Sequence, residues 1–561
     1  MALVLLVAGA CVAPDPIDTA EPDSQAPPDS DTPDTSTDTE APVEHILSDL
    51  VATLDPYDRA PLTAVLTVAH EALDPATVEA VTLTLSGDGD DLAVTLDPQA
   101  EGWTRLLDQE LVEEGRFGLP VIGLFAGSET TVELVLETPD ATFSGSLAIT
   151  TDELPDQGGQ GRSLTVSQAE GEPGWPWFDG FAYDTTGALR WKGPAITQQL
   201  DDGAILTGFD EVDWLGRTLL DRVLPEGMRW HHDAIQLPGG TVLGCVDDEA
   251  SRVVTREGEL ERASQDQLVE LAADGSEVVN VWDLRAFLDV DRATLRDKGG
   301  DWVHVNTLVY DEHADAVVIS ARYQGLVSLS RGGEAGDEPN AGKELRWIFA
   351  PHMGWGRSGW DGQGELETAD HLLTAVDSTG QPFGEGVQQN LEAPGDDEEA
   401  FFWPLAQHGL RITHRQDGLL RLLTFSNQAS MLFDGPDSIG NATGWTSHGD
   451  LSNDRTGGPY SVLAEYEIDE EALTVRMVAA FGADQPELYG SMEGGVSLGR
   501  ETGNPFLVTP GYDQADPAES YSPVVVEVDA AGEEVSRFTV DSTAYTAMKG
   551  GRLLPYAEVR R

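Results

Sequence analysis

Apolar and polar residues alternate in several short runs in the first quarter of the chain. Examples are residues 64–68 (AVLTV), 81–85 (VTLTL) and 131–136 (TVELVL), and segments with Asp or Gly separate them. Successive side chains of a β-strand point to opposite faces, so this alternation indicates half-buried strands. Several such strands at this spacing predict a small β-sandwich over residues 45–155.

A looser repeat follows over residues 156–561. Each unit has an apolar strand, a turn with Asp and Gly, a second strand and a further strand introduced by Gly-Gly or Asp-Gly. Turns of these kinds occur at residues 183–187, 271–275 and 528–532, and at 237–241 and 416–420. Repeats of roughly 50 to 70 residues are typical of propellers, here with about six blades. We therefore predict an all-β fold, a six-bladed β-propeller preceded by the small β-sandwich; a pair of ordinary sandwiches is the alternative.

The start of the chain has a different composition. Residues 1–11 are a short apolar run that ends in small residues before Cys11, which resembles a bacterial lipoprotein signal with Cys11 as the lipidation site. Residues 12–44 are almost entirely Asp, Glu, Pro, Ser, Thr and Ala, without Lys or Arg, which predicts a disordered linker. We expect an exported protein that a lipid on Cys11 anchors to the bacterial outer membrane, on the periplasmic side or the cell surface.

The net charge restricts the partners. The chain has 100 acidic and 32 basic residues, a formal net charge of −68. Nucleic acids are bound by clustered Lys and Arg, so we expect no nucleic-acid partner. An anionic substrate would need a local group of His and Arg that overcomes the field of the whole protein. The two cysteines, Cys11 and Cys245, exclude a disulfide framework.

Histidines occur at comparable places in three of the repeats. His231 and His232 open a strand that leads to a Gly-Gly turn, whereas His304 and His408 each precede a strand, and Arg322 lies one strand after His304. In a propeller the inner strands converge on the axial channel, so these side chains are candidates for one site. For each histidine taken singly, a satisfied structural role is the alternative.

The residue types in these segments favour an anion over a metal ion. No carboxylate has matching spacing in all three segments, and Arg322 would repel a cation, so we expect neither a metal nor another cofactor. Histidine and arginine together suit an oxyanion, as in phosphoryl or sulfuryl transfer.

Taken together, these segments resemble the bacterial arylsulfotransferase family. The resemblance is carried, in the same order along the chain, by residues 119–125 (LPVIGLF), 231–233 (HHD) with the turn at 237–240, 304–306 (HVN), 320–325 (SARYQG), 345–348 (LRWI) and 407–409 (QHG). It implies an aryl-sulfate sulfotransferase that needs no nucleotide, takes a sulfuryl group from a phenolic sulfate ester and gives it to a phenolic acceptor with ping-pong kinetics.

The resemblance also implies catalytic roles for individual residues. His408 would be the transient sulfohistidine, and His304, Arg322 and His232 would hold the sulfuryl oxygens, with His304 also as the proton donor. Neighbours in a strand face opposite sides, so only one of His231 and His232 is expected to point into the channel. His232, directly before Asp233, is the choice.

Two other functions stay open at this point. A non-catalytic binding module on the cell surface would keep its ligand without His408, and a hydrolase with the same cluster would release phenol at a rate that an added phenol does not change. The Gly- and Trp-rich loops at 352–360 and 444–448 suit a mobile aromatic wall around a ring substrate, or equally caps that join blades.

Overall fold

The computed structural model describes residues 42–553 with internal gaps. The gaps are residues 90, 97–111, 114–115, 155–163, 172, 179, 201, 249–252, 257–258, 263–265, 291, 293–301, 333–338, 360–361, 391–393, 395–398, 429–459, 491–492, 510–521 and 541–549. The predicted signal with Cys11, nearly all of the predicted linker and the loop at 444–448 lie outside the described residues. The first described strand begins at Val43, one residue before the expected end of the linker.

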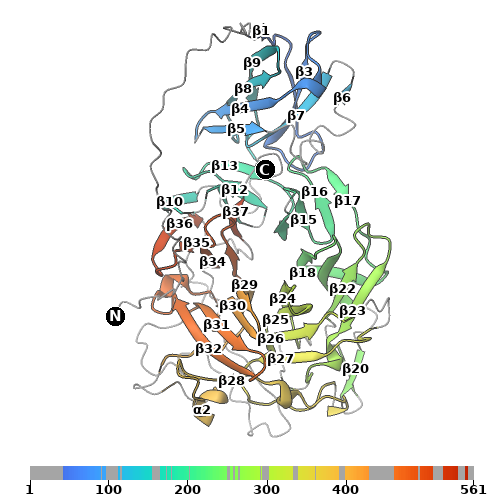
Figure 1. Cartoon of the computed structure of the whole chain (residues 1–561), viewed down its shortest axis with the longest axis vertical. Helices are drawn as coiled ribbons and strands as arrows, with labels where there is room; N and C mark the ends of the chain where they lie inside the picture. Colours follow the sequence, from blue (N-terminus) through green and yellow to red (C-terminus); the bar gives the residue numbers. More distant parts are fainter. Residues whose placement is uncertain are drawn as a thin grey trace, which may run out of the picture.

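Two sheets form the N-terminal unit, which lies at the top of Figure 1. The first sheet consists of β1 (Val43–Ile46), β9 (Ala141–Thr150), β8 (Glu129–Glu137), β4 (Ala80–Ser86) and β5 (Leu92–Leu96). The second consists of β2 (Val51–Leu54), β3 (Thr63–Ala69), β7 (Arg116–Ile122) and β6 (Val112–Glu113). In β4 the buried and half-buried positions alternate, because Val81, Leu83 and Leu85 face the shared core. The predicted β-sandwich is confirmed.

The rest of the described chain forms six successive sheets around a common centre (Figure 1). The first sheet consists of β37 (Gly550–Leu553), β11 (Trp175–Phe178), β12 (Phe181–Tyr183) and β13 (Leu189–Lys192). The second consists of β14 (Gln198–Gln199), β15 (Ile205–Thr207), β16 (Asp210–Val212) and β17 (Thr218–Leu220). The third consists of β18 (Met228–Gln236), β19 (Val242–Asp248), β22 (Asp266–Leu271) and β23 (Val278–Asp283). A separate hairpin, β20 (Val253–Arg256) with β21 (Glu259–Arg262), extends from the third sheet.

The other three sheets complete the ring. The fourth sheet consists of β24 (Val305–Asp311), β25 (Ala316–Ala321), β26 (Gly325–Ser330) and β27 (Leu345–Phe349). The fifth consists of β29 (His408–Gln416), β30 (Leu419–Ser426), β31 (Val462–Asp469), β32 (Thr474–Phe481) and β28 (Thr374–Ala375). The sixth consists of β33 (Gly495–Leu498), β34 (Pro505–Thr509), β35 (Val524–Val528), β36 (Glu534–Val540) and β10 (Leu164–Ala169). The all-β propeller fold is confirmed; the blade number of six stays a prediction, with which these sheets agree.

Helical segments in the described residues are short. They are α2 (Glu385–Gln388) and the 3₁₀ turns η1 (Pro75–Thr77), η3 (Leu284–Ala286), η6 (Thr368–His371) and η8 (Pro486–Leu488). Within the described part of the chain, no helix has the length and apolar character that a membrane span requires.

The ring closes where its beginning meets its end. The last described strand, β37, pairs with β11, and β10 pairs with β36, so both of these sheets combine strands from the two ends of the propeller region. Each closure replaces exposed strand edges with hydrogen bonds to a distant part of the sequence, which removes edges available for aggregation.

The Asp-Gly turns predicted from the sequence form hairpins for a local reason. In the turn between β12 and β13, Asp184 Oδ1 accepts hydrogen bonds from the backbone N–H of Thr186 and Ala188, both at 3.0 Å. Asp529 accepts in the same way from Ala531 and Glu533 between β35 and β36. The residue three positions after each Asp is a glycine with positive φ, +91° and +80° respectively. The Asp side chain thus stabilises a turn that glycine makes sterically possible.

Six strands face the centre of the ring, one from each sheet. They follow each other as β14, β18, β24, β29, β33 and β37, with consecutive strands packed side by side. The turns and loops that introduce these strands therefore meet at one end of the ring, which is where the sequence places its histidines.

Candidate active site

The structure brings all four predicted site residues together at one end of three adjacent inner strands. His232 lies within β18, His304 directly precedes β24, and His408 is the first residue of β29. Arg322 directly follows β25, the strand that pairs with β24. Because β18, β24 and β29 are neighbours around the centre, their histidines converge although about 180 residues separate the first from the last.

A bulge in β18 changes the expected arrangement of the histidine pair. The pairing of β18 with β19 shifts between Trp230 and Ala234, and His232 has a φ of +57°. The Nδ1 atoms of His231 and His232 are 2.8 Å apart, so one donates a hydrogen bond to the other. The expectation that the two side chains face opposite sides is therefore wrong, because the bulge breaks the alternation of the strand. Of the two, His232 contacts the next blade, with its ring centroid 4.6 Å from that of His304.

His304 and Arg322 occupy facing ends of one hairpin. The backbone N–H of Arg322 donates to the carbonyl of His304 at 3.0 Å, and the guanidinium carbon of Arg322 lies 5.3 Å from the ring centroid of Tyr323. His304 has a φ of +50°, in the left-handed region that costs a non-glycine residue about 1–2 kcal/mol. His232 and His304 both carry this strain, which is a feature of sites where side-chain direction matters more than backbone stability.

The hydrogen bonds around His408 fix its tautomer. Its Nδ1 lies 2.6 Å from Asn427 Oδ1 and 3.1 Å from the carbonyl oxygen of Ala406. A carbonyl can only accept, and Asn427 uses its Nδ2 to donate to the carbonyls of Gly490 and Glu493, at 2.7 and 2.9 Å. Both partners of Nδ1 are therefore acceptors, so Nδ1 carries the hydrogen and Nε2 keeps an unshared electron pair.

His408 is also held in the neutral form. Only 4% of the residue is exposed. Burial lowers the pKa of His408 well below its ordinary value, and the positive charge of Arg322 and the nearby His304 lower it further, against the opposing effect of the bond to Asn427. A buried, neutral imidazole with one free nitrogen is a competent nucleophile near neutral pH.

Buried polar side chains tie the three inner strands to one another. Asp233 Oδ2 accepts from the backbone N–H of Leu308, and Thr307 Oγ1 accepts from that of Gly409, at 2.9 and 3.0 Å. Beside them, Asn306 Nδ2 donates to the carbonyl of Gln407 at 2.7 Å. These bonds cross from β18 to β24 and from β24 to β29, so the positions of the four site residues are coupled.

Gln407 extends this coupling to Arg322. Its Nε2 donates to the carbonyls of Ala321 and Gly325, both at 2.9 Å, and these two residues flank the loop that contains Arg322. The side chain of Gln407 is fully buried. Arg322 and His408 are therefore held at a fixed separation by the residue that precedes His408.

Sequence reasoning missed Asn427, the main side-chain partner of His408. A signal existed, because the predicted turn at 416–420 folds β29 back along β30. In a regular hairpin closed by this turn, residue 408 would pair with residue 427. Two bulges shift the register, so that His408 pairs with Phe425 in the structure. Counting along a predicted hairpin could have placed Asn427 beside the histidine.

The described part of the 352–360 loop has fixed contacts. Trp355 Nε1 donates to the carbonyl of Pro351 at 2.9 Å, and the guanidinium carbon of buried Arg292 lies 4.0 Å from the Trp355 ring centroid. This packing favours the blade-cap interpretation for Trp355. Across the described residues, no group of three or more His, Cys, Asp or Glu side chains is arranged to hold a metal ion, and Cys245 is buried.

A ring of antiparallel sheets with a His-Arg cluster at one end of its inner strands defines a β-propeller whose centre can receive an oxyanion. The sequence profile of the family described as Arylsulfotransferase (ASST) matches residues 177–549, more than half of the chain. The chain belongs to the arylsulfotransferase family.

Individual relatives agree with this assignment over part of their length. The chain is similar to arylsulfate sulfotransferase AssT of Lelliottia amnigena, with 27% identity over 311 residues, and to AssT of Escherichia coli O6:H1, with 26% identity over 314 residues. Each match covers 49% of this chain and 44% of the relative, so less than half of the relatives' length is matched. Among solved structures, the C-terminal WD40 domain of Sif2 matches over 74% of this chain and 91% of its own, at 10% identity and a TM-score of 0.24, too low to bear on the fold.

Proposed function

We propose that this protein transfers a sulfuryl group from a phenolic sulfate ester to a phenolic acceptor, with His408 as the transient carrier. The observation that carries the proposal is the state of His408, which is buried and neutral, with Nδ1–H engaged and Nε2 free. Membership of the arylsulfotransferase family supports the same type of reaction. The names of the two AssT relatives agree with it.

In the first step, Nε2 of His408 attacks the sulfur of the donor. A bond forms between Nε2 and sulfur as the bond between sulfur and the phenolic oxygen breaks, and the phenolate leaves with the electron pair of that bond. Charge develops on the sulfuryl oxygens and on the leaving oxygen, which fixed cationic and N–H donors can stabilise. Arg322 is the cation beside His408, and we assign it to the sulfuryl oxygens together with His232.

In the second step, the oxygen of an acceptor phenol attacks the same sulfur. The bond between sulfur and Nε2 breaks, the electron pair returns to His408, and the acceptor proton is lost to a base. We assign proton donation to the leaving phenolate, and later proton removal from the acceptor, to His304, whose ring lies between His232 and Tyr323. One site serves both steps, so donor and acceptor bind in turn.

The lowered pKa of His408 gives an expected pH profile. The nucleophile is the neutral form of His408, which is present above its pKa. Because this pKa lies well below about 6.5, the ordinary value for histidine, protonation of His408 should reduce the transfer rate only at a pH well below that value. In Asn427→Asp, a carboxylate would face Nδ1–H and favour the imidazolium, so the acid limb of kcat/KM should move to higher pH. An acid limb that does not move, in a variant with unchanged circular dichroism, would contradict the assigned contact.

The experiment that tests the proposal is phenol release from a chromogenic aryl sulfate by the purified protein, without nucleotide, at several concentrations of a second phenol. We expect acceptor-dependent release and parallel lines in a double-reciprocal plot, the signature of a ping-pong mechanism. Release that the acceptor does not change would indicate a hydrolase. No release from any of several aryl sulfates would leave the binding module as the better account.

A further inference from the structure

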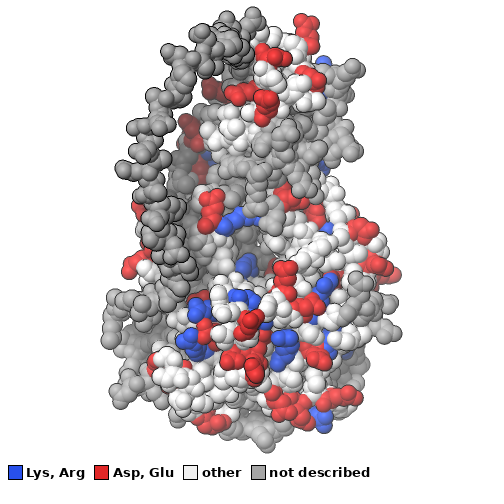
Figure 2. Space-filling model, viewed as in Figure 1, with Lys and Arg blue, Asp and Glu red and all other residues white. Residues whose placement is uncertain are grey.

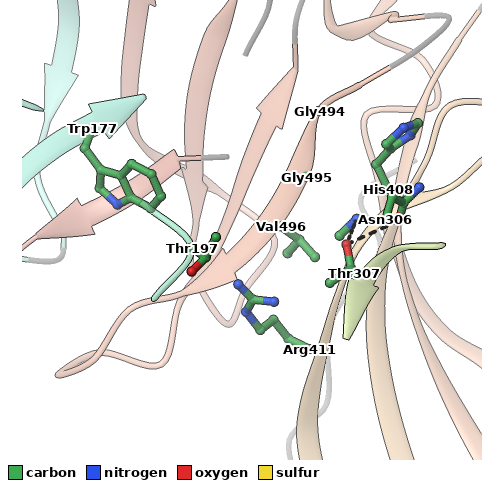
Figure 3. A pocket seen from close by; sticks show the side chains of 10 residues that line it. Trp177, Thr197, Asn306, Thr307, His408, Arg411, Gly494, Gly495 and Val496 are labelled. Atoms are coloured by element: carbon green, nitrogen blue, oxygen red, sulfur yellow. Dashed lines mark hydrogen bonds between the residues drawn. The ribbon is translucent and has the colours of Figure 1, made fainter. Parts of the chain in front are cut away.

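A cavity lies beside His408, between the inner strands β24, β29 and β33, and His232 and His304 are not among its lining residues. The space between its walls, including the part that is open to solvent, is about 480 Å³. Figure 3 shows its lining, which comes from four of the six sheets and from the residue that precedes β14 in a fifth. The lining residues are Trp177, Thr197, Asn306, Thr307, His408, Gly409, Arg411, Gly494, Gly495 and Val496.

One of the lining side chains is a cation that points into the cavity. The guanidinium of Arg411 extends from β29 toward Thr197 and Val496 (Figure 3). Its Nη1 donates to the carbonyl of Leu410 at 2.6 Å. No carboxylate of the described residues forms an ion pair with Arg411, whereas Arg415, four residues further along the same strand, pairs with Asp311 at 3.0 Å and Glu470 at 2.5 Å.

The charge of Arg411 is only partly balanced by the protein. Burial lowers the pKa of Arg411, and the negative charge of Asp233 acts in the opposite direction without direct contact. Asp233 directs its Oδ2 to the backbone N–H of Leu308 instead. Arg411 is half-buried, and an arginine in proteins stays protonated, so its charge is partly removed from water without an ion-pair partner among the described residues. The unused N–H groups of Arg411 therefore favour an anion from outside the chain.

The chemistry of the cavity narrows the class of anion. A guanidinium binds planar or tetrahedral oxyanions through two parallel N–H groups, and Trp177 supplies an aromatic wall in the same cavity. The hydroxyl of Thr197 donates to the carbonyl of Leu206 at 2.9 Å, so Arg411 and not Thr197 is the donor for an anion. On the face shown in Figure 2, Lys and Arg side chains lie near the central hollow, with Asp and Glu side chains beside them.

We propose that this cavity is a second anion site, in which Arg411 binds a small oxyanion, either a carboxylate or an inorganic sulfate, separately from the sulfuryl group at Arg322. The site does not require the proposed reaction, because it is defined by binding at equilibrium. His408 lines this cavity and Arg322 does not, so an anion bound at Arg411 would add negative charge near the proposed nucleophile without occupying the position of the sulfuryl group.

Calorimetric titration of the purified protein tests the proposal. The probes are sodium sulfate and sodium benzoate in chloride-free buffer, against wild type, Arg411→Met, Arg411→Lys and Arg322→Met. We expect at least one probe to bind wild type, and its Kd to rise at least about tenfold in Arg411→Met, since a charged bidentate contact is lost. The Kd of Arg411→Lys should lie between those of wild type and Arg411→Met. Arg322→Met should bind the probe with the same Kd as wild type.

The outcomes show which anion binds, a carboxylate or inorganic sulfate, and whether Arg411 or Arg322 binds it. Binding of benzoate but not sulfate identifies a carboxylate ligand, and the reverse identifies inorganic sulfate. Equal affinity in wild type and Arg411→Met, loss of binding in Arg322→Met alone, or no binding of either probe to wild type would overturn the proposal. Melting temperatures of all four proteins separate a lost contact from a lost fold. The titration measures binding and not sulfuryl transfer. The anion-site proposal can therefore fail while the proposed transfer activity is confirmed, and the activity can be absent while the anion site is confirmed.

Discussion

Replacing His408 with alanine is expected to lower acceptor-dependent phenol release by at least about 10⁴-fold, because the nucleophile is removed while the rest of the cluster remains. The relevant measurement is the initial rate of phenol release from a chromogenic aryl sulfate at saturating acceptor. The change deletes a buried ring, so the melting temperature should fall somewhat as well.

Two further variants separate chemistry from folding in this test. His408→Gln keeps a polar side chain of similar length and should be as inactive as the alanine variant with a smaller loss of stability. His414→Ala, in the same strand β29 but away from the cluster, should retain wild-type rates. A His408→Gln protein that is folded and keeps more than about a hundredth of the wild-type rate would remove His408 from the nucleophile's role.

The Arg322→Met variant is expected to lose about 10² to 10³ in kcat/KM, which corresponds to about 2.7–4 kcal/mol of transition-state stabilisation. Arg322 is the charged group that acts most strongly on His408, and its charge would meet the sulfuryl oxygens as they separate from the donor oxygen. Steady-state kinetics at varied donor concentration measure the change.

The same substitution at another arginine is the matched control. Arg421 pairs with Glu467 at the surface, and 34% of the Arg421 side chain is exposed. Arg421→Met should therefore change kcat/KM by less than about twofold, since exposed ion pairs contribute little. Arg322→Lys should recover part of the rate through its charge. Equal rates for Arg322→Met and wild type would place the sulfuryl group elsewhere.

The sequence predicts those parts of the fold that depend on local patterns. The alternating runs at 64–68, 81–85 and 131–136 lie within β3, β4 and β8, and the five predicted turns each lie between two paired strands. Alternation and turn chemistry are local properties, so they are readable without a structure. The pairings β10–β36 and β11–β37 join residues more than 350 positions apart, and no local pattern encodes them.

The site was predictable as a set of residues, but not in its geometry. His232, His304, Arg322 and His408 were found from their places in the repeat, which fixes the end of the ring to which each belongs. The contact between His231 and His232 depends on a bulge in β18, and alternation along a strand does not predict where a bulge occurs. The role of Arg411 follows from a missing carboxylate partner among the described residues, which is a property of the folded cavity.

The central claim is a covalent sulfuryl group on His408, and mass spectrometry of the quenched enzyme tests it most directly. The protein is mixed with an aryl sulfate in the absence of acceptor, quenched at alkaline pH and digested. We expect one added sulfuryl group on the peptide that contains His408, its loss when a phenol is added before the quench, and its absence in His408→Gln. A wild-type enzyme that turns over and carries the group on another residue, or on none, would contradict the account.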